Sequence, residues 1–148
     1  MEIENKTIGI ACDHAAYKTK EALKEKLMNQ GYAVMDFGTH SEESCDYPDF
    51  AHLLGEAISK KKCDFGFSLC GSGNGITMTA NKHKGVRAAL CWMPEIATLA
   101  KQHNDANICG IPARFVTIEQ AFAIADAFIK AEFEGGRHQK RVEKIEAV

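Results

Sequence analysis

Short runs of apolar residues alternate along the chain with segments in which apolar residues recur every three or four positions. The runs predict buried strands, and the recurring positions predict helices with one face turned toward a core. Strands that alternate with helices in this way indicate a parallel sheet covered on both faces. We therefore expect an α/β fold, a three-layer sandwich around a five-stranded parallel sheet, with strands at 7–12, 32–38, 64–70, 86–91 and 106–111.

The expected helices begin or end at recognisable residues. Leu23 and Leu27 mark one face of the first helix, which should end near Gly31. Two later helices are expected to open at Pro48 and Pro94, because proline is favoured in the first turn of a helix. A short helix should start at about Gly75, and a last amphipathic helix closes the chain. A long helix before it carries the apolar stripe Ile118, Ala121, Phe122, Ala125, Phe128 and Ile129.

Composition places the chain among ordinary globular proteins. Its 148 residues, 45% hydrophobic and 26% charged, are enough for one domain over 1–148 that needs no disulfide. No secretory signal opens the sequence, and no apolar run approaches the roughly 18 residues of a membrane helix. We therefore expect a cytoplasmic protein with reduced thiols and no membrane partner. A net charge of −2 gives no general attraction for nucleic acid.

The six cysteines lie far apart and form no CxxC pair, which argues against a zinc knuckle and a redox dithiol. Most are interpreted as packing residues, as is Trp92. Three histidines, His40, His52 and His83, show no metal-ligand spacing with one another. The packing cysteines are Cys12, Cys45, Cys63, Cys91 and Cys109.

The remaining cysteine, Cys70, ends the third predicted strand and opens the loop "CGSGNG". The loop matches neither a dinucleotide fingerprint, nor a Walker A loop, nor a nucleophile elbow. Its backbone N–H groups, followed by a helix N-terminus, would favour a bound anion and a thiolate on Cys70. The alternative is a tight strand-to-helix turn with a buried thiol, and the loop by itself does not decide between them.

Other polar residues lie next to predicted strands, and ligands of parallel sheets bind beyond the carboxyl ends of the strands. Asp13 and His14 follow the first strand, and His103 and Asn104 precede the fifth. We expect them to converge with Cys70. Asp13 has an alternative role as a helix cap, and His103 has one at a helix end. His14 has no comparable structural role, which favours a function.

Arg137 and Arg141 stand four positions apart on one face of the last helix. Two guanidinium groups at this spacing repel each other unless an anion lies between them, and a phosphate suits arginine's paired donors. The alternative is a solvated surface helix, which Glu143 and Glu146 support. No aromatic residues interleave with these cations, so a nucleic-acid surface is not expected.

Taken together, "CDHAAYK", "DYPDFA", "CGSGNG", "ANKHKGVRA", "QHNDAN" and "GGRHQKRVEKI" closely resemble the ribose-5-phosphate isomerases of the B type. That family includes galactose-6-phosphate and allose-6-phosphate isomerases. The resemblance spans nearly the whole chain, with the motifs in order. It implies a Rossmann-like domain that works as a homodimer or homotetramer, with the site at a subunit interface and no metal or organic cofactor.

The resemblance also implies roles for individual residues. Cys70 matches the base that transfers the proton, and His103 matches the residue that opens the sugar ring. Ser72 stands in the catalytic loop where many members carry threonine, and Ile76 stands where one branch carries a glutamate base. The positions that match substrate contacts are Asp13, His14, Gly71, Gly73, Asn74, Gly75 and Asn104, with Arg114, Arg137 and Arg141 as phosphate contacts.

The function implied is the interconversion of D-ribose 5-phosphate and D-ribulose 5-phosphate through a cis-enediolate. An isomerase of allose 6-phosphate or galactose 6-phosphate is an alternative within the same class, because the sequence does not show the depth of a pocket. A non-catalytic sugar-phosphate sensor is an alternative from another class. The combination of Cys70, Ser72 and His103 argues against a sensor, which needs no proton carrier.

Overall fold

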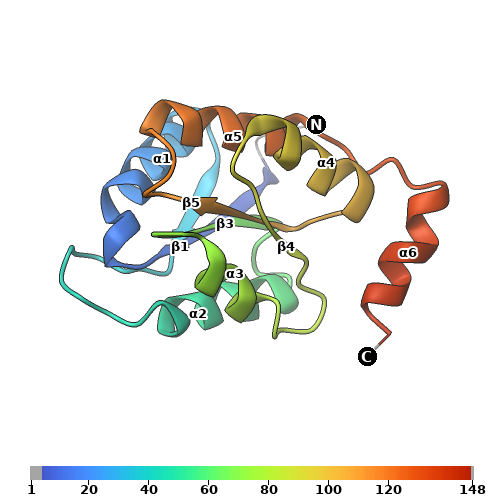
Figure 1. The fold of residues 1–148 in the computed structure, drawn as a ribbon, viewed down its shortest axis with the longest axis horizontal. Coiled ribbons are helices and arrows are strands. Elements are labelled where there is room, and N and C mark those ends of the chain that lie inside the picture. The colour runs from blue at the N-terminus through green and yellow to red at the C-terminus, as the bar shows by residue number, and fades with distance from the viewer. Residues whose placement is uncertain (1–4, 148) are drawn as a thin grey trace.

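A five-stranded sheet forms the middle layer of the computed structural model, which describes residues 5–147 (Figure 1). Every strand pair is parallel, in the order β2-β1-β3-β5-β4. This confirms the predicted α/β fold. Four strands are shorter than expected, β2 and β4 by three residues each, and β4 has only three residues at the edge of the sheet. The strands are β1 Thr7–Cys12, β2 Ala33–Asp36, β3 Phe65–Cys70, β4 Ala88–Leu90 and β5 Ile108–Pro112.

Helices cover both faces of the sheet. In Figure 1, α1, α4 and α5 lie on one face and α2 and α3 on the other, while α6 projects beside the body. The helix α5 begins with a capping box, which the side chains of Thr117 and Gln120 form with each other's backbone N–H groups. The helices are α1 Tyr17–Asn29, α2 Tyr47–Ser59, α3 Asn74–Ala80, α4 Pro94–Asn104, α5 Ile118–Lys130 and α6 Arg137–Ile145, with a 3₁₀ turn η2 at His14–Ala16.

The core between the sheet and the α1, α4 and α5 layer is aromatic. Phe65, Phe67 and Phe128 pack with ring centroids 5.8–6.2 Å apart. The prediction that Trp92 belongs to the core was wrong, since its side chain is 54% exposed. Trp92 follows the edge strand β4, which has a neighbouring strand on one side only. Ile118, at the start of α5, is also exposed.

The strand order has its switch point at the carboxyl ends of β1 and β3. The chain passes from β1 to β2 on one side and then crosses to β3 on the other. The connections therefore diverge at this point, and ligands of such sheets bind there. Within residues 5–147, no helix is both long enough and apolar enough to cross a bilayer.

A buried charge pair supports the carboxyl end of β1. The Lys20 side chain is fully buried, and its Nζ donates to Asp36 Oδ2 at 2.7 Å. Asp36 Oδ1 accepts the Gly38 N–H at 2.9 Å. Gly38 and Thr39 in turn bond to the backbone of Cys12 at 2.7 and 2.8 Å. The pair thus holds the loop after β2 against the end of β1.

Candidate active site

Cys70 ends β3, and its thiol points to the glycine loop that follows. The Gly73 N–H donates to Cys70 Sγ at 3.1 Å, and the cysteine is only 5% exposed beside Ala51 and Ile76. Gly73 has φ +77°, and a Cβ there would lie 2.5 Å from Leu90 Cδ1. Only glycine therefore allows the backbone to turn this tightly and present its amide to the sulfur.

Asp13 and His14 lie beside this loop, as expected for residues that follow β1. The Asp13 N–H donates to Leu69 O at 3.1 Å, which places Asp13 next to the end of β3. Its Oδ1 also accepts the Ala16 N–H at 3.2 Å, so the capping role is real. The expectation that His14 has no structural role was wrong, because its Nδ1 accepts the Cys45 N–H at 3.2 Å. This bond fixes the loop before α2.

Arg114 and Tyr47 complete the surroundings of the loop. The Arg114 N–H donates to Gly71 O at 3.0 Å, and its side chain lies over Gly71, where a Cβ would be 3.2 Å from Arg114 Cδ. The Tyr47 ring covers Gly75 so closely that a Cβ there would lie 2.5 Å from the ring. Sequence reasoning missed Tyr47, although it stands in the quoted motif "DYPDFA".

Two polar side chains of the loop are exposed. Ser72 Oγ accepts the Asn74 N–H at 3.2 Å, so both residues lie at the start of α3. We call Asp13, His14, Tyr47, the loop 70–75 and Arg114 the carboxyl-edge group.

His103 and Asn104 do not join this group, and the expected convergence within one chain was wrong. They precede β5, and residues that precede a parallel strand lie at its amino end. Ile108 pairs with Gly66, whereas Cys70 pairs with Pro112 at the other end of the same ladder. The four residue steps from one pair to the other span about 13 Å. His103 therefore lies beyond the amino ends of the strands, the amino edge, while Cys70 of the same chain lies at their carboxyl ends, the carboxyl edge.

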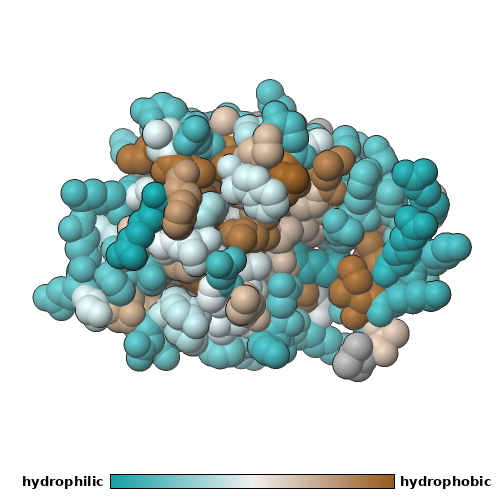
Figure 2. Space-filling model, in the orientation of Figure 1, coloured by the Kyte–Doolittle hydropathy of each residue, from teal (hydrophilic) through white to brown (hydrophobic). Residues whose placement is uncertain are grey.

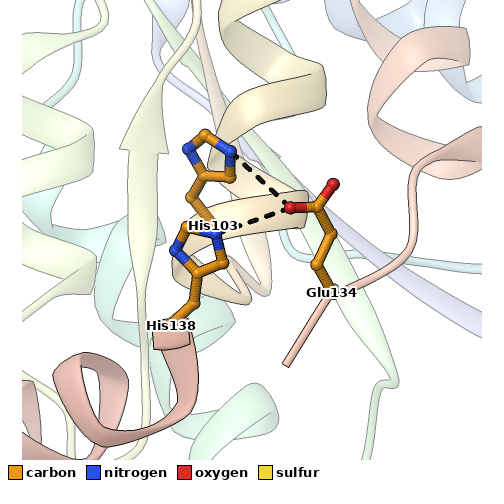
Figure 3. Close-up of side chains that lie close together, drawn as sticks. All are labelled: His103, Glu134 and His138. Atoms are coloured by element: carbon orange, nitrogen blue, oxygen red, sulfur yellow. Dashed lines mark ion pairs between the residues drawn. The ribbon is translucent and has the colours of Figure 1, made fainter. Parts of the chain in front are cut away.

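His103 instead lies against two residues that sequence reasoning missed. Its ring stacks on His138, with centroids 4.3 Å apart and an interplanar angle of 12°. Glu134 Oε1 lies 3.8 Å from His103 Nε2 and 3.4 Å from His138 Nε2 (Figure 3). Desolvation and the neighbouring imidazole hold the pKa of His138 below its ordinary value. No spacing rule in the sequence signals this contact between two helices.

The helix α6 brings its arginines to the same edge. Arg137 and Arg141 are exposed on it, one turn apart. Arg87 ties this helix to the end of α4, because its Nε donates to Asp105 O at 2.9 Å and its Nη1 to Glu146 Oε1 at 2.7 Å. We call His103, Asn104, Glu134, Arg137, His138 and Arg141 the amino-edge group.

A cleft of about 670 Å³ lies between α6 and the body. It is lined by the segment 81–89, by Asn104 and by Ile145 and Glu146. Figure 2 shows the hydrophilic outer surface of α6 and hydrophobic atoms on the part turned toward the body. The cleft thus adjoins the amino-edge group and is remote from Cys70.

A further pair of histidines is in direct contact. His52 on α2 and His83 after α3 show no metal-ligand spacing in the sequence, yet His52 Nδ1 lies 2.8 Å from His83 Nε2. Burial and the second imidazole lower the pKa of His83. Only one nitrogen of such a pair can carry the shared proton.

Comparisons with known proteins identify the family of the chain. The sequence matches the Ribose/Galactose Isomerase family model over residues 8–145. It is 42% identical to ribose-5-phosphate isomerase B of Escherichia coli, over 97% of this chain and 96% of that protein. It is 44% identical to a probable ribose-5-phosphate isomerase B of Mycoplasma genitalium, over 93% and 92% of the two chains.

Solved structures give the same result. A ribose 5-phosphate isomerase from Thermotoga maritima is similar with a TM-score of 0.95 and 47% identity, covering 97% of this chain and 99% of that one. The ribose-5-phosphate isomerase B of Mycoplasma genitalium with bound ribulose-5-phosphate gives a TM-score of 0.92 and 43% identity, covering 95% and 94%. In sequence and in fold, the chain belongs to the ribose/galactose isomerase family.

Proposed function

We propose that the protein interconverts D-ribose 5-phosphate and D-ribulose 5-phosphate through a cis-enediolate. The observation that carries the proposal is the Cys70 thiol, which accepts the Gly73 N–H at the carboxyl ends of the adjacent strands β1 and β3. Similarity to named ribose-5-phosphate isomerases, one of them with bound ribulose-5-phosphate, supports the choice of substrate.

In the proposed reaction, the Cys70 thiolate removes the proton from C2 of the aldose and returns it to C1. A positioned base of this kind contributes about 10²–10⁴-fold to the rate. The amides of residues 71–75 face the negative charge that develops on the substrate oxygens, and a preorganised donor is worth about 2.7–4 kcal/mol. Ile76 is fully buried and has no ionisable group, so the position cannot replace Cys70 as the base.

We propose that each site is made by two copies of the chain. Cys70 and His103 lie at opposite edges of one sheet, so a single substrate can meet both only when they come from different copies. In a twofold symmetric dimer the carboxyl-edge group of one copy faces the amino-edge group of the other, and the arrangement repeats at the second site. Exposed apolar side chains suit such an interface: Leu53, Met78, Trp92, Met93 and Phe115.

The roles of the two groups follow from this arrangement. His103 opens the sugar ring by exchanging a proton with it, and Asn104 contacts the sugar. Arg137 and Arg141 bind the phosphate together with Arg114 of the facing copy, and so orient the reacting carbons. Asp13 and His14 contact the substrate beside the loop. A homotetramer built from two such dimers would contain the same sites.

The remaining expectations fit this proposal. The proton transfer uses side chains and amides alone, so it requires no metal or organic cofactor. We take residues 1–148 as a single isomerase domain. We also propose the cytoplasm as its location, where thiols stay reduced, and the six cysteines are free in the structure.

The activity is tested by incubating the protein in deuterated water with ribose 5-phosphate, with allose 6-phosphate or with unphosphorylated ribose. We expect NMR to show ribulose 5-phosphate and deuterium exchange at the carbon next to the carbonyl, with little reaction of ribose, which lacks the phosphate. Faster turnover of allose 6-phosphate would reassign the substrate to a hexose phosphate. Binding of ribose 5-phosphate without product or exchange would favour the sensor and contradict the proposal.

A further inference from the structure

Three metal-ligating side chains converge at the amino edge from separate segments. His103 belongs to the last turn of α4, Glu134 to the connection between α5 and α6, and His138 to the first turn of α6 (Figure 3). One ligand atom from each lies within 4.8 Å of the other two. Two imidazoles and one carboxylate are a donor set that binds Zn²⁺ with a fourth position open.

The distances already approach those of a metal site. Ligand atoms at about 2.0–2.2 Å from a tetrahedral zinc ion lie about 3.3–3.6 Å from one another. The carboxylate oxygen of Glu134 lies 3.4 Å from His138 Nε2 and 3.8 Å from His103 Nε2. The two rings are stacked nearly parallel, so at least one imidazole must turn out of the stack before all three donors point at one ion.

The backbone holds the three segments together. The Glu134 N–H donates to Gln102 O at 3.0 Å, which attaches the connection directly before His103. Gly135 and Gly136 both have positive φ and reverse the chain, so that His138 returns over the His103 ring. His138 is only 7% exposed, while the side chains of His103 and Glu134 are 37% and 50% exposed. The ligands are thus positioned by the fold, and an ion can reach them from solvent.

We propose that His103, Glu134 and His138 bind a divalent transition metal of the Zn²⁺ class, and that the bound ion inhibits the isomerase. The inhibition rests on the proposed function, because a metal on His103 Nε2 removes the nitrogen that exchanges protons with the sugar ring. A metal at this position is therefore a regulator or an inhibitor rather than a cofactor.

The donor atoms, and not the surrounding charge, decide which ions bind. Glu134 supplies one negative charge, while Arg137 and Arg141 on α6 are close enough to disfavour a cation. Ions that depend on oxygen ligands, such as Mg²⁺ and Ca²⁺, gain little from imidazole nitrogen, whereas Zn²⁺ and Co²⁺ bind it well. Mg²⁺ should therefore neither bind at this site nor inhibit.

The test uses Co²⁺ as a spectroscopic probe, because the free cysteines are competing ligands for any soft metal. We expect wild-type protein to bind a single Co²⁺ per chain with the visible absorption of a nitrogen and oxygen site, and without thiolate-to-cobalt charge transfer. Glu134→Gln should weaken this binding by about tenfold or more. The control Glu132→Gln, in the same connection, should bind as the wild type does. Thiolate charge transfer, or equal binding by Glu134→Gln, would overturn the proposal.

A second measurement distinguishes failure of the metal site from failure of the proposed isomerase function. Zn²⁺ should inhibit wild-type isomerisation reversibly, and a chelator should restore the activity. For Glu134→Gln, with inhibition measured against the metal-free rate of the variant itself, the same fractional inhibition should need about tenfold more Zn²⁺. If Co²⁺ binds as expected but no isomerisation occurs, the proposed function fails and the metal site remains. If isomerisation occurs and Co²⁺ does not bind, the metal site alone is disproved.

Discussion

Cys70→Ala and Cys70→Ser are both expected to lose isomerase activity by about 10²–10⁴-fold or more, the contribution of a positioned base. The loss should appear in kcat, because in the proposed reaction the sulfur acts on the proton in transit and contributes little to binding of the sugar phosphate. Serine is the informative replacement. Its hydroxyl can still accept the Gly73 N–H that now meets Cys70 Sγ, so the loop keeps its bond while the base is lost.

Steady-state kinetics and circular dichroism of the two variants check this expectation. Cys63→Ala is the matched control, since Cys63 is a buried thiol that precedes the amino end of β3. It should keep the wild-type kcat. A serine variant with near wild-type turnover would remove Cys70 from the mechanism.

Asp36→Ala is expected to destabilise the fold by about 3–5 kcal/mol, the cost of leaving one partner of a buried ion pair alone. Without Asp36, the fully buried Lys20 ammonium keeps one carboxylate among residues 5–147, Glu21 with its Oε2 at 3.5 Å, and the Tyr17 ring at 5.3 Å. Urea unfolding measures the difference. Glu56→Ala, which removes the exposed partner of Lys60, should cost about 0–1 kcal/mol. Equal losses of unfolding free energy in the two variants would show that the buried Lys20–Asp36 pair stabilises the fold no more than an exposed pair does.

The same pair predicts how stability depends on pH. Burial alone would raise the pKa of Asp36, but the Lys20 and Lys24 ammonium groups and the Gly38 N–H outweigh it, so the pKa lies below the ordinary 3.8. The unfolded chain then takes up the proton at a higher pH than the folded protein does. The contribution of Asp36 is thus complete at neutral pH and is lost as the pH falls from 3.8 through the folded pKa. Asp36→Ala should lack this part of the acid destabilisation.

The sequence predicted the fold well because the sheet is built from buried apolar runs, and these leave a direct pattern. The prediction failed where neighbours in space, rather than the local pattern, decide the environment. Trp92 is hydrophobic but follows the edge strand β4, and it is exposed. His52 and His83 are far apart in the sequence. Their ring nitrogens lie 2.8 Å from each other only because α2 packs against α3 and the loop that follows it.

The candidate site could likewise be predicted only in part. Cys70, the glycine loop and Asp13 could be placed together, because they directly follow adjacent parallel strands. His103 was placed at the wrong edge, since it precedes its strand rather than following it. Glu134 and His138 carry no recognisable signal, because their contact with His103 depends on the turn at Gly135 and Gly136.

Mixing two inactive variants tests the central claim most directly, namely that one copy supplies Cys70 and another supplies His103. Cys70→Ala and His103→Ala protein are each expected to be inactive alone, and they are mixed under conditions in which subunits exchange, with mixed dimers verified by native mass spectrometry. Random exchange makes half of the dimers mixed, each with one complete site, so about a quarter of the wild-type activity should return. Mixed dimers that form and remain inactive would contradict a site shared between two copies.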